Sequence, residues 1–243
     1  VGHASGQLAD FQGAQKISAL AGLVGGVVGR AFYVAASRAI ARGDRGQLEK
    51  HITDTVMLLS LAAAAVSVPC IVLRQEIVGL LYGDRLPAAV DALWIISLAL
   101  PFSFVGFIPS NLLAASGHGW SRLAITAFFA ILTWPAAYLA TVRWGINGAA
   151  ATMSIFSAAS ALTLWITQRM SLGYRLPLGP MWRVATASGV ATGLLLSLGG
   201  VVTLPVSVPV AASGFVIVLL AVDRNQRRRI ATLTRLRRGE VPG

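Results

Sequence analysis

The segment GLVGGVVGRAFYVAASRAIARGDRGQ, residues 22–47, decides the fold class of this chain. Its first half consists of glycine and aliphatic residues with one arginine, and such apolar runs are typical of the interior of membrane-spanning helices. Its second half carries Arg38, Arg42 and Arg45, which is typical of a helix that ends at the cytoplasmic face of a membrane. Arg30 interrupts the apolar half, so a permanent positive charge is predicted inside the bilayer.

The composition of the whole chain agrees with this interpretation. Of its 243 residues 56% are hydrophobic and only 12% are charged, and the mean hydropathy is +0.72. A water-soluble surface does not tolerate this balance, so we predict an all-α, polytopic transmembrane helix bundle. The net charge of +11 would suggest nucleic acid in a soluble domain, but here the basic residues separate apolar runs, and no nucleic-acid partner is predicted.

Seven segments are long and apolar enough to span a membrane, which takes roughly 17 to 25 residues. They are residues 17–41, 52–73, 88–113, 120–142, 145–167, 183–204 and 206–222. The chain begins at Val1 without a signal peptide, so we expect it to be part of a longer protein. The single cysteine, Cys70, excludes an intrachain disulfide, and no cofactor or metal is predicted.

The arginines and lysines between the spans predict the orientation. With the end of the first span in the cytoplasm, 15 of the 20 basic residues fall inside, and seven of those are arginines of the segment after residue 222. The positive-inside rule then predicts an outer N-terminus and a cytoplasmic C-terminus. Four tryptophans lie at predicted span ends, as in an interfacial aromatic belt: Trp120, Trp144, Trp165 and Trp182.

Small residues four positions apart predict close contacts between helices. Three glycine pairs have this spacing: Gly22 with Gly26, Gly25 with Gly29, and Gly189 with Gly193. Such spacing is common in membrane helices, so it predicts packing within the bundle rather than a specific dimer.

Five segments taken in order resemble a known family. They are GQLADFQGAQKI, FYVAASRAIARGDRGQLEK, EIVGLLYGDRLPAAVDALWIISLALPFSF, NLLAASGHG and WGINGAAATMSI. Over residues 5–170 the chain resembles the C-terminal half of polysaccharide flippases, the lipid-linked oligosaccharide exporters of the multidrug/oligosaccharidyl-lipid/polysaccharide transporter superfamily. The resemblance rests on three features: a short helix after an outer loop that contains Leu80–Gly83, the end of a helix at Asn111–Gly117, and the start of a helix at Gly145–Thr152. One departure is Val34, which stands where the family often has a kink-forming proline.

The resemblance implies an architecture and a set of partners. Residues 1–170 would form the C-terminal transporter lobe with helices 8 to 12 of the family, residues 171–222 an additional transmembrane hairpin, and residues 223–243 a basic cytoplasmic tail. The implied function is the flipping of a polyprenyl-pyrophosphate-linked oligosaccharide across a bacterial inner membrane for surface polysaccharide export. The implied partners are that substrate, membrane lipids, a missing N-terminal half, and polysaccharide polymerase and glycosyltransferases.

Arg30 is the first candidate for the substrate site. At about 1.5 Å per residue it lies roughly 20 Å along its helix from Ile17 and about 12 Å before Arg38, inside the hydrocarbon. A guanidinium can bind pyrophosphate oxygens bidentately, so we predict that Arg30 lines a substrate cavity. The alternatives are snorkelling to the interface and an ion pair with an acid of the missing half.

Other polar residues are weaker candidates. Asn111 and Ser110, near the inner end of the third span, and Arg122, after the next inner turn, are candidates to line the cavity, although a helix-to-helix hydrogen bond suits Asn111 better. Asp54 and Asp91 are candidates for ion coupling, but both lie one turn inside a predicted span start, where the helix dipole favours a carboxylate.

Two other functions in the superfamily remain open. An ion-coupled multidrug or cation antiporter needs acids deep in the bundle, and none of the nine acids falls at mid-span. A lipid II flippase would bind a chemically similar substrate. An enzyme is not predicted, because the chain contains no H-E-x-x-H, D-x-D or G-x-S-x-G motif.

Overall fold

A computed structural model describes residues 2–83 and 86–174, together with residues 179, 181, 184–186, 188–189 and 192–193. The chain divides into two compact units, Val1–Met181 and Trp182–Gly243, and the described helices belong to the first. The predicted spans at 183–204 and 206–222, Trp182 and the basic tail fall mainly or wholly outside the described residues.

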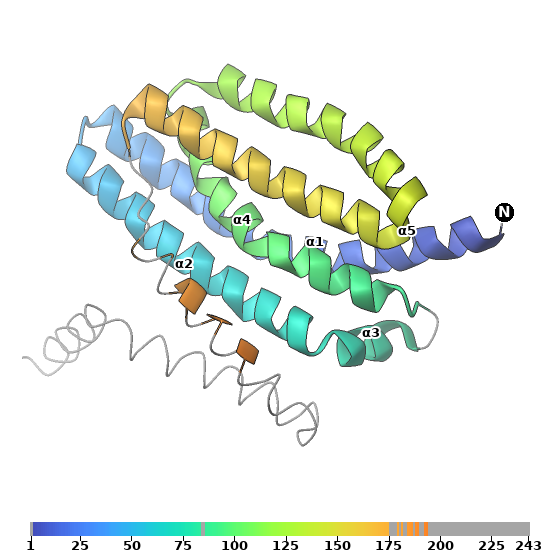
Figure 1. The fold of residues 1–243 in the computed structure, drawn as a ribbon. Coiled ribbons are helices and arrows are strands. Elements are labelled where there is room, and N and C mark those ends of the chain that lie inside the picture. The colour runs from blue at the N-terminus through green and yellow to red at the C-terminus, as the bar shows by residue number, and fades with distance from the viewer. Residues whose placement is uncertain are drawn as a thin grey trace, which may run out of the picture. The chain divides into compact units, whose positions relative to one another are not determined.

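Five α-helices follow one another in the first unit, and no strand occurs among the described residues (Figure 1). They are α1 (Gly2–Ala41), α2 (Arg45–Val72), α3 (Arg74–Tyr82), α4 (Ala89–Ala115) and α5 (Gly119–Leu172). The prediction of an all-α bundle of membrane helices is therefore confirmed. The short helix implied by the resemblance is α3, and α1 runs without a break through Val34.

Four helices are long and apolar enough to cross a membrane, and they cover the first five predicted spans. These segments are Phe11–Ala41, Arg45–Val72, Ala89–Ala115 and Gly119–Leu172. The last contains two spans, because its 54 residues would extend over about 80 Å as a straight helix. It folds back at Gly145, whose φ of 62° and ψ of −150° are not helical (Figure 1).

Local sequence explains where these helices begin and end. Asp44 caps α2, since its carboxylate accepts a hydrogen bond from the backbone N–H of Gln47 at 2.9 Å. α2 thus begins seven residues before the predicted span. α5 ends at Gly173, whose left-handed φ of 73° suits a glycine. Pro101 and Pro109 lie inside α4, which bundled membrane helices tolerate.

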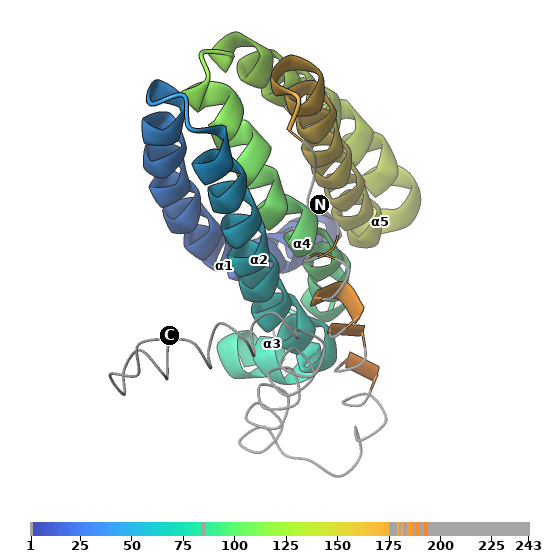
Figure 2. The same ribbon diagram turned by 90° about the vertical axis from the view of Figure 1, so that its left-hand side faces the viewer.

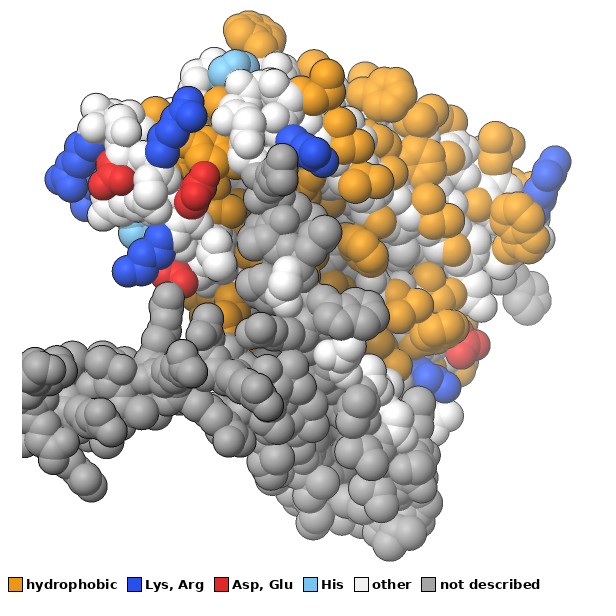
Figure 3. Space-filling model, turned by 60° about the vertical axis from the view of Figure 1, so that its left-hand side comes forward, with side chains coloured by type: hydrophobic (Ala, Val, Ile, Leu, Met, Phe, Trp, Pro, Cys, Tyr) orange, Lys and Arg blue, Asp and Glu red, His pale blue; other side chains and the backbone are white. Residues whose placement is uncertain are grey.

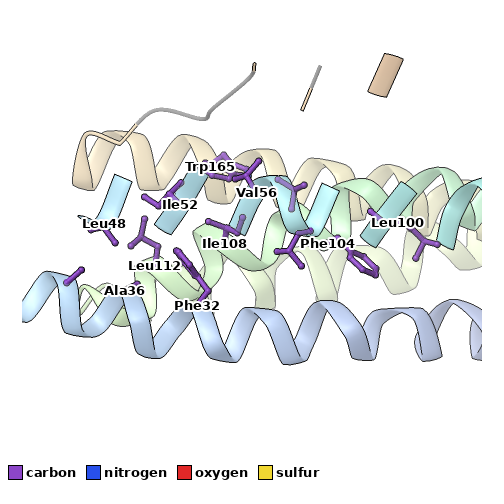
Figure 4. Close-up of a cluster of buried hydrophobic side chains, with 14 residues drawn as sticks. Phe32, Ala36, Leu48, Ile52, Val56, Leu100, Phe104, Ile108, Leu112 and Trp165 are labelled. Carbon is purple, nitrogen blue, oxygen red and sulfur yellow. The ribbon is translucent and has the colours of Figure 1, made fainter. Parts of the chain in front are cut away.

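α4 is the central helix of the bundle. It contacts α1 and α2 on one side and α5 on the other (Figures 1 and 2). Its buried side chains Leu100, Phe104, Ile108 and Leu112 meet residues of α1 and α2 in one core cluster (Figure 4). From the other helices that cluster takes Phe32, Ala36, Leu48, Ile52, Val56 and Trp165, among others.

Trp165 is a correction to the predicted aromatic belt. Its side chain is buried in this core cluster, only 7% exposed, whereas Trp120 and Trp144 are 83% and 68% exposed at the ends of the first part of α5. Position near a span end therefore did not distinguish a core tryptophan from an interfacial one. Packing against α2 and α4 decides the difference.

Candidate functional site

The four glycines of α1 lie on one side of the helix but differ in what they meet. Gly25 and Gly29 pack on α4: a Cβ at Gly25 would lie 2.8 Å from the Phe107 ring, and one at Gly29 would lie 2.9 Å from Asn111 Nδ2. Gly22 and Gly26 have nothing within 4 Å of a Cβ at either position. The close packing predicted for Gly25 and Gly29 is confirmed, while Gly22 and Gly26 leave an open surface.

Arg30 lies on the open side of α1. It follows Gly26 by four residues, so the two share a face. Its side chain is exposed, as are the apolar neighbours Val27 and Val34, at 67% and 47%. Within the part of the chain that the structure describes, Arg30 has no hydrogen bond or ion pair. Between Lys16 and Arg38, near the two ends of the candidate span Phe11–Ala41, Arg30 is the one charged side chain.

Asn111 faces α1 but bonds within its own helix. Its Nδ2 donates to the Phe107 carbonyl at 2.7 Å, and the same nitrogen lies against Gly29. The amide is partly buried, which agrees with a role in contact between helices. Ser110 beside it is also partly buried. Asn111 therefore lies close to the residue that precedes Arg30, on the α4 side of α1.

Arg122 lies elsewhere, in the first turn of α5. We call the end of the bundle that holds the α1–α2 and α4–α5 turns the basic end. Its exposed cations are Arg38, Arg42, Arg45, Lys50, Arg122 and Arg169. Figure 3 shows the charged side chains gathered towards the ends of the bundle, with hydrophobic ones along its flank. The structure therefore does not bring Arg122 to Arg30.

The two carboxylate candidates differ in position. Asp91 lies in the first turn of α4, where the helix dipole stabilises a negative charge, as expected. Asp54 does not lie in a first turn, because α2 begins at Arg45 and its capping residue is Asp44. The dipole interpretation of Asp54 is wrong for this reason. Asp54 is exposed and lies about one turn beyond Lys50 of the basic end.

Other potentially reactive side chains among the described residues lie in structural positions. These residues hold no cluster of three His, Cys, Asp or Glu side chains that could bind a metal ion. The His118 ring lies 3.1 Å from the Ser116 carbonyl in the α4–α5 turn, which suits a loop residue. Cys70 is buried in the core around α3 and α4, so its role is packing.

Sequence reasoning missed the serines that join α4 to α5. Ser154 Oγ donates to the Ile95 carbonyl at 3.0 Å, and Ser103 Oγ lies 2.7 Å from Ser157 Oγ. Small polar residues inside apolar spans are the signal that could have identified them, because such residues hydrogen-bond across membrane helices. Their partners could not have been found, since 54 or more residues separate the paired positions.

A comparison with protein families identifies the family of this chain. The family model MatE matches residues 3–139, which run from α1 into the first part of α5. The chain belongs to the MatE family. As a member it is a multi-pass membrane transporter of the multidrug/oligosaccharidyl-lipid/polysaccharide transporter superfamily. No curated protein and no solved structure matches the chain.

Proposed function

We propose that this MatE protein flips a polyprenyl-pyrophosphate-linked oligosaccharide from the inner to the outer face of a bacterial plasma membrane. The proposal rests mainly on Arg30, an exposed arginine on the apolar face of a helix that can span the membrane. Family membership supports transport, and Arg30 supports an anionic substrate. We propose no enzymatic role and no cofactor.

The energetics of Arg30 favour a polar surrounding on this face of α1. An arginine at mid-membrane costs about 2.5 to 3.5 kcal/mol on insertion scales, so such residues usually face a partner or a water-filled cavity. No described carboxylate pairs with Arg30. A pyrophosphate would meet this need, because its oxygens accept paired hydrogen bonds from the guanidinium fork.

The glycines beside Arg30 agree with a bulky ligand. Side chains on a helix lean towards its N-terminus, so the guanidinium of Arg30 is expected over the Gly26 side of the face. The absence of side chains at Gly26 and Gly22 leaves room there. In this proposal Asn111 and Ser110 border the same region from α4, and Arg122 contributes to the positive charge of the basic end.

The proposal includes an orientation and partners. The basic end of the bundle would face the cytoplasm, and the C-terminus would lie on the same side. Membrane lipids would cover the apolar outer faces, and a further lobe of the same protein would close the cavity that Arg30 lines. Polysaccharide polymerase and glycosyltransferases would act on the same lipid-linked sugar.

Export complementation with Arg30 variants tests the proposal. Arg30→Ala should lose export, and Arg30→Lys should keep only part of it, because lysine retains the charge but not the bidentate geometry. Arg38→Ala is the matched control, since Arg38 lies two turns further along α1 at the basic end and should be dispensable. Full export by both Arg30 variants at normal membrane levels would refute the role of Arg30.

One observation favours a second candidate, an ion-coupled multidrug or cation antiporter. Asp54 lies inside α2 rather than in its first turn, so the helix dipole does not account for its carboxylate, which could carry a proton or sodium ion. Asp54→Asn separates the two functions: loss of ion-driven drug efflux would favour the antiporter. Unchanged sugar export in the same variant would favour the flippase. A lipid II flippase would share the pyrophosphate site and differ in the sugar exported.

A further inference from the structure

The contacts of α4 with α5 differ in kind from its contacts with α1. Two side-chain hydrogen bonds join α4 to the second part of α5, from Ser154 to the Ile95 carbonyl and between Ser103 and Ser157. They lie on either side of Pro101, where α4 lacks a backbone N–H. Breaking such bonds inside a membrane leaves polar groups without water, so α4 and α5 are held as a pair.

The contact of α1 with α4 has no such bond. In the described residues no side-chain hydrogen bond links the two helices, and the Asn111 amide that lies against Gly29 donates to its own helix. Gly25 and Gly29 lie against Phe104, Phe107 and Asn111, and further along α1 the apolar side chains of Phe32 and Ala36 are buried in the core cluster with α4. Movement along this contact would exchange van der Waals neighbours without exposing a polar group.

The N-terminal part of α1 is attached to the bundle through α3. The Tyr82 hydroxyl of α3 donates to the Gly13 carbonyl at 3.3 Å, and a Cβ at Gly13 would lie 2.9 Å from Leu86. From this attachment α1 continues through four glycines to Arg30, and glycine weakens helix rigidity. The helix therefore has an anchored end, a glycine-rich middle and an apolar contact with α4.

We propose that α1 shifts against the paired α4 and α5 during transport, and that it carries Arg30 with it. The contact of Gly25 and Gly29 with Phe104 and Phe107 is the surface along which α1 moves. This inference rests on the proposed function, because it assigns the moving helix of the same site. It adds that the Arg30 guanidinium changes position relative to α4 while the α4–α5 pair remains intact.

Two disulfides, one between α1 and α4 and one between α4 and α5, test the inference. Each is introduced into the full-length protein with Cys70 replaced by alanine. Gly29→Cys with Phe107→Cys locks α1 to α4, since the two Cβ atoms would lie 3.4 Å apart. Gly106→Cys with Ala161→Cys locks α4 to α5, with the Cβ atoms 3.1 Å apart. Both separations are near the roughly 3.5 to 4.5 Å that a disulfide spans. Export of lipid-linked sugar is measured before and after oxidation, and again after reduction.

We expect oxidation to abolish export in the α1–α4 pair, reduction to restore it, and the α4–α5 pair to export normally throughout. Normal export by the oxidised α1–α4 pair would overturn the inference. Loss of export in both oxidised pairs would overturn it too, because the α4–α5 pair would then also move. If the first variant does not reach the membrane, Gly29→Cys alone takes its place: its thiol would pack against Phe107 and should react faster with a membrane-permeant maleimide during transport, and equal labelling with and without transport would overturn the inference.

The same experiment separates failure of this inference from failure of the proposed function. If the reduced variants and the parent protein export no lipid-linked sugar, the flippase function fails, and the inference fails with it. If the reduced variants export sugar and the locked α1–α4 pair does so equally well, only the inference fails.

Discussion

Alanine at the four glycines of α1 should reveal which face of this helix packs in the bundle. The variant Gly25→Ala with Gly29→Ala adds methyl groups that would meet the Phe107 ring at 2.8 Å and Asn111 Nδ2 at 2.9 Å. The control, Gly22→Ala with Gly26→Ala, adds the same two methyl groups to a face where nothing lies within 4 Å. Both variants gain equal helix propensity, about 1 kcal/mol per position, so the comparison isolates packing.

The magnitude follows from what the added methyl groups meet. Overpacking a close contact costs about 1 to 3 kcal/mol, and each contact here involves the end of a side chain that can shift, which favours the lower value. The packed-face variant should therefore be about 2 kcal/mol less stable than the control. At about 2–4 °C per kcal/mol for a chain of this length, its midpoint should be about 4–8 °C lower.

Thermal unfolding in detergent, followed by the loss of monodisperse protein, measures this difference. Equal midpoints for the two double variants, or a lower midpoint for the control, would refute the conclusion that Gly25 and Gly29 are packed while Gly22 and Gly26 are not. Single variants at each position then show whether Gly25 or Gly29 contributes more.

Three further predictions concern the bundle. Gly145→Ala should destabilise the fold by about 1–3 kcal/mol in thermal unfolding, because its φ of 62° with ψ of −150° is nearly closed to other residues. Ser103→Ala and Ser157→Ala should show a coupling of about 0.6 kcal/mol in a double-mutant cycle, and additive effects would mean that their hydrogen bond is not formed. Asp44→Ala should cost about 1 kcal/mol through loss of the bond to Gln47, which Asp44→Asn should largely preserve in the same assay.

Apolar composition and span length made much of the fold predictable. The first five predicted spans coincide with described helices, and the order of segments from Gly6 to Ile155 indicated the superfamily that the MatE match supports. Helix boundaries were less predictable. α2 begins at Arg45 because Asp44 caps it, whereas hydropathy alone placed its start at residue 52. Capping depends on local hydrogen bonds that a hydropathy window does not represent.

The candidate site shows the same limit. Sequence identified Arg30 as a charge within a span, because charge and apolar run lie in one segment. It could not tell that Gly25 and Gly29 pack on α4 while Gly22 and Gly26 do not, since the two glycine pairs have the same spacing. Likewise Arg122 lies at the basic end, away from Arg30, because α5 starts there.

The sequence by itself determined that this chain is a bundle of membrane helices with an arginine inside one span. Those properties depend on the hydropathy and length of continuous segments, which each segment carries on its own. Only the tertiary structure decided that α4 is central, that serines bond it to α5, and that Gly25 and Gly29 of α1 pack closely against it. These features depend on which distant faces meet, and in a bilayer close packing, rather than the exclusion of water, selects those faces.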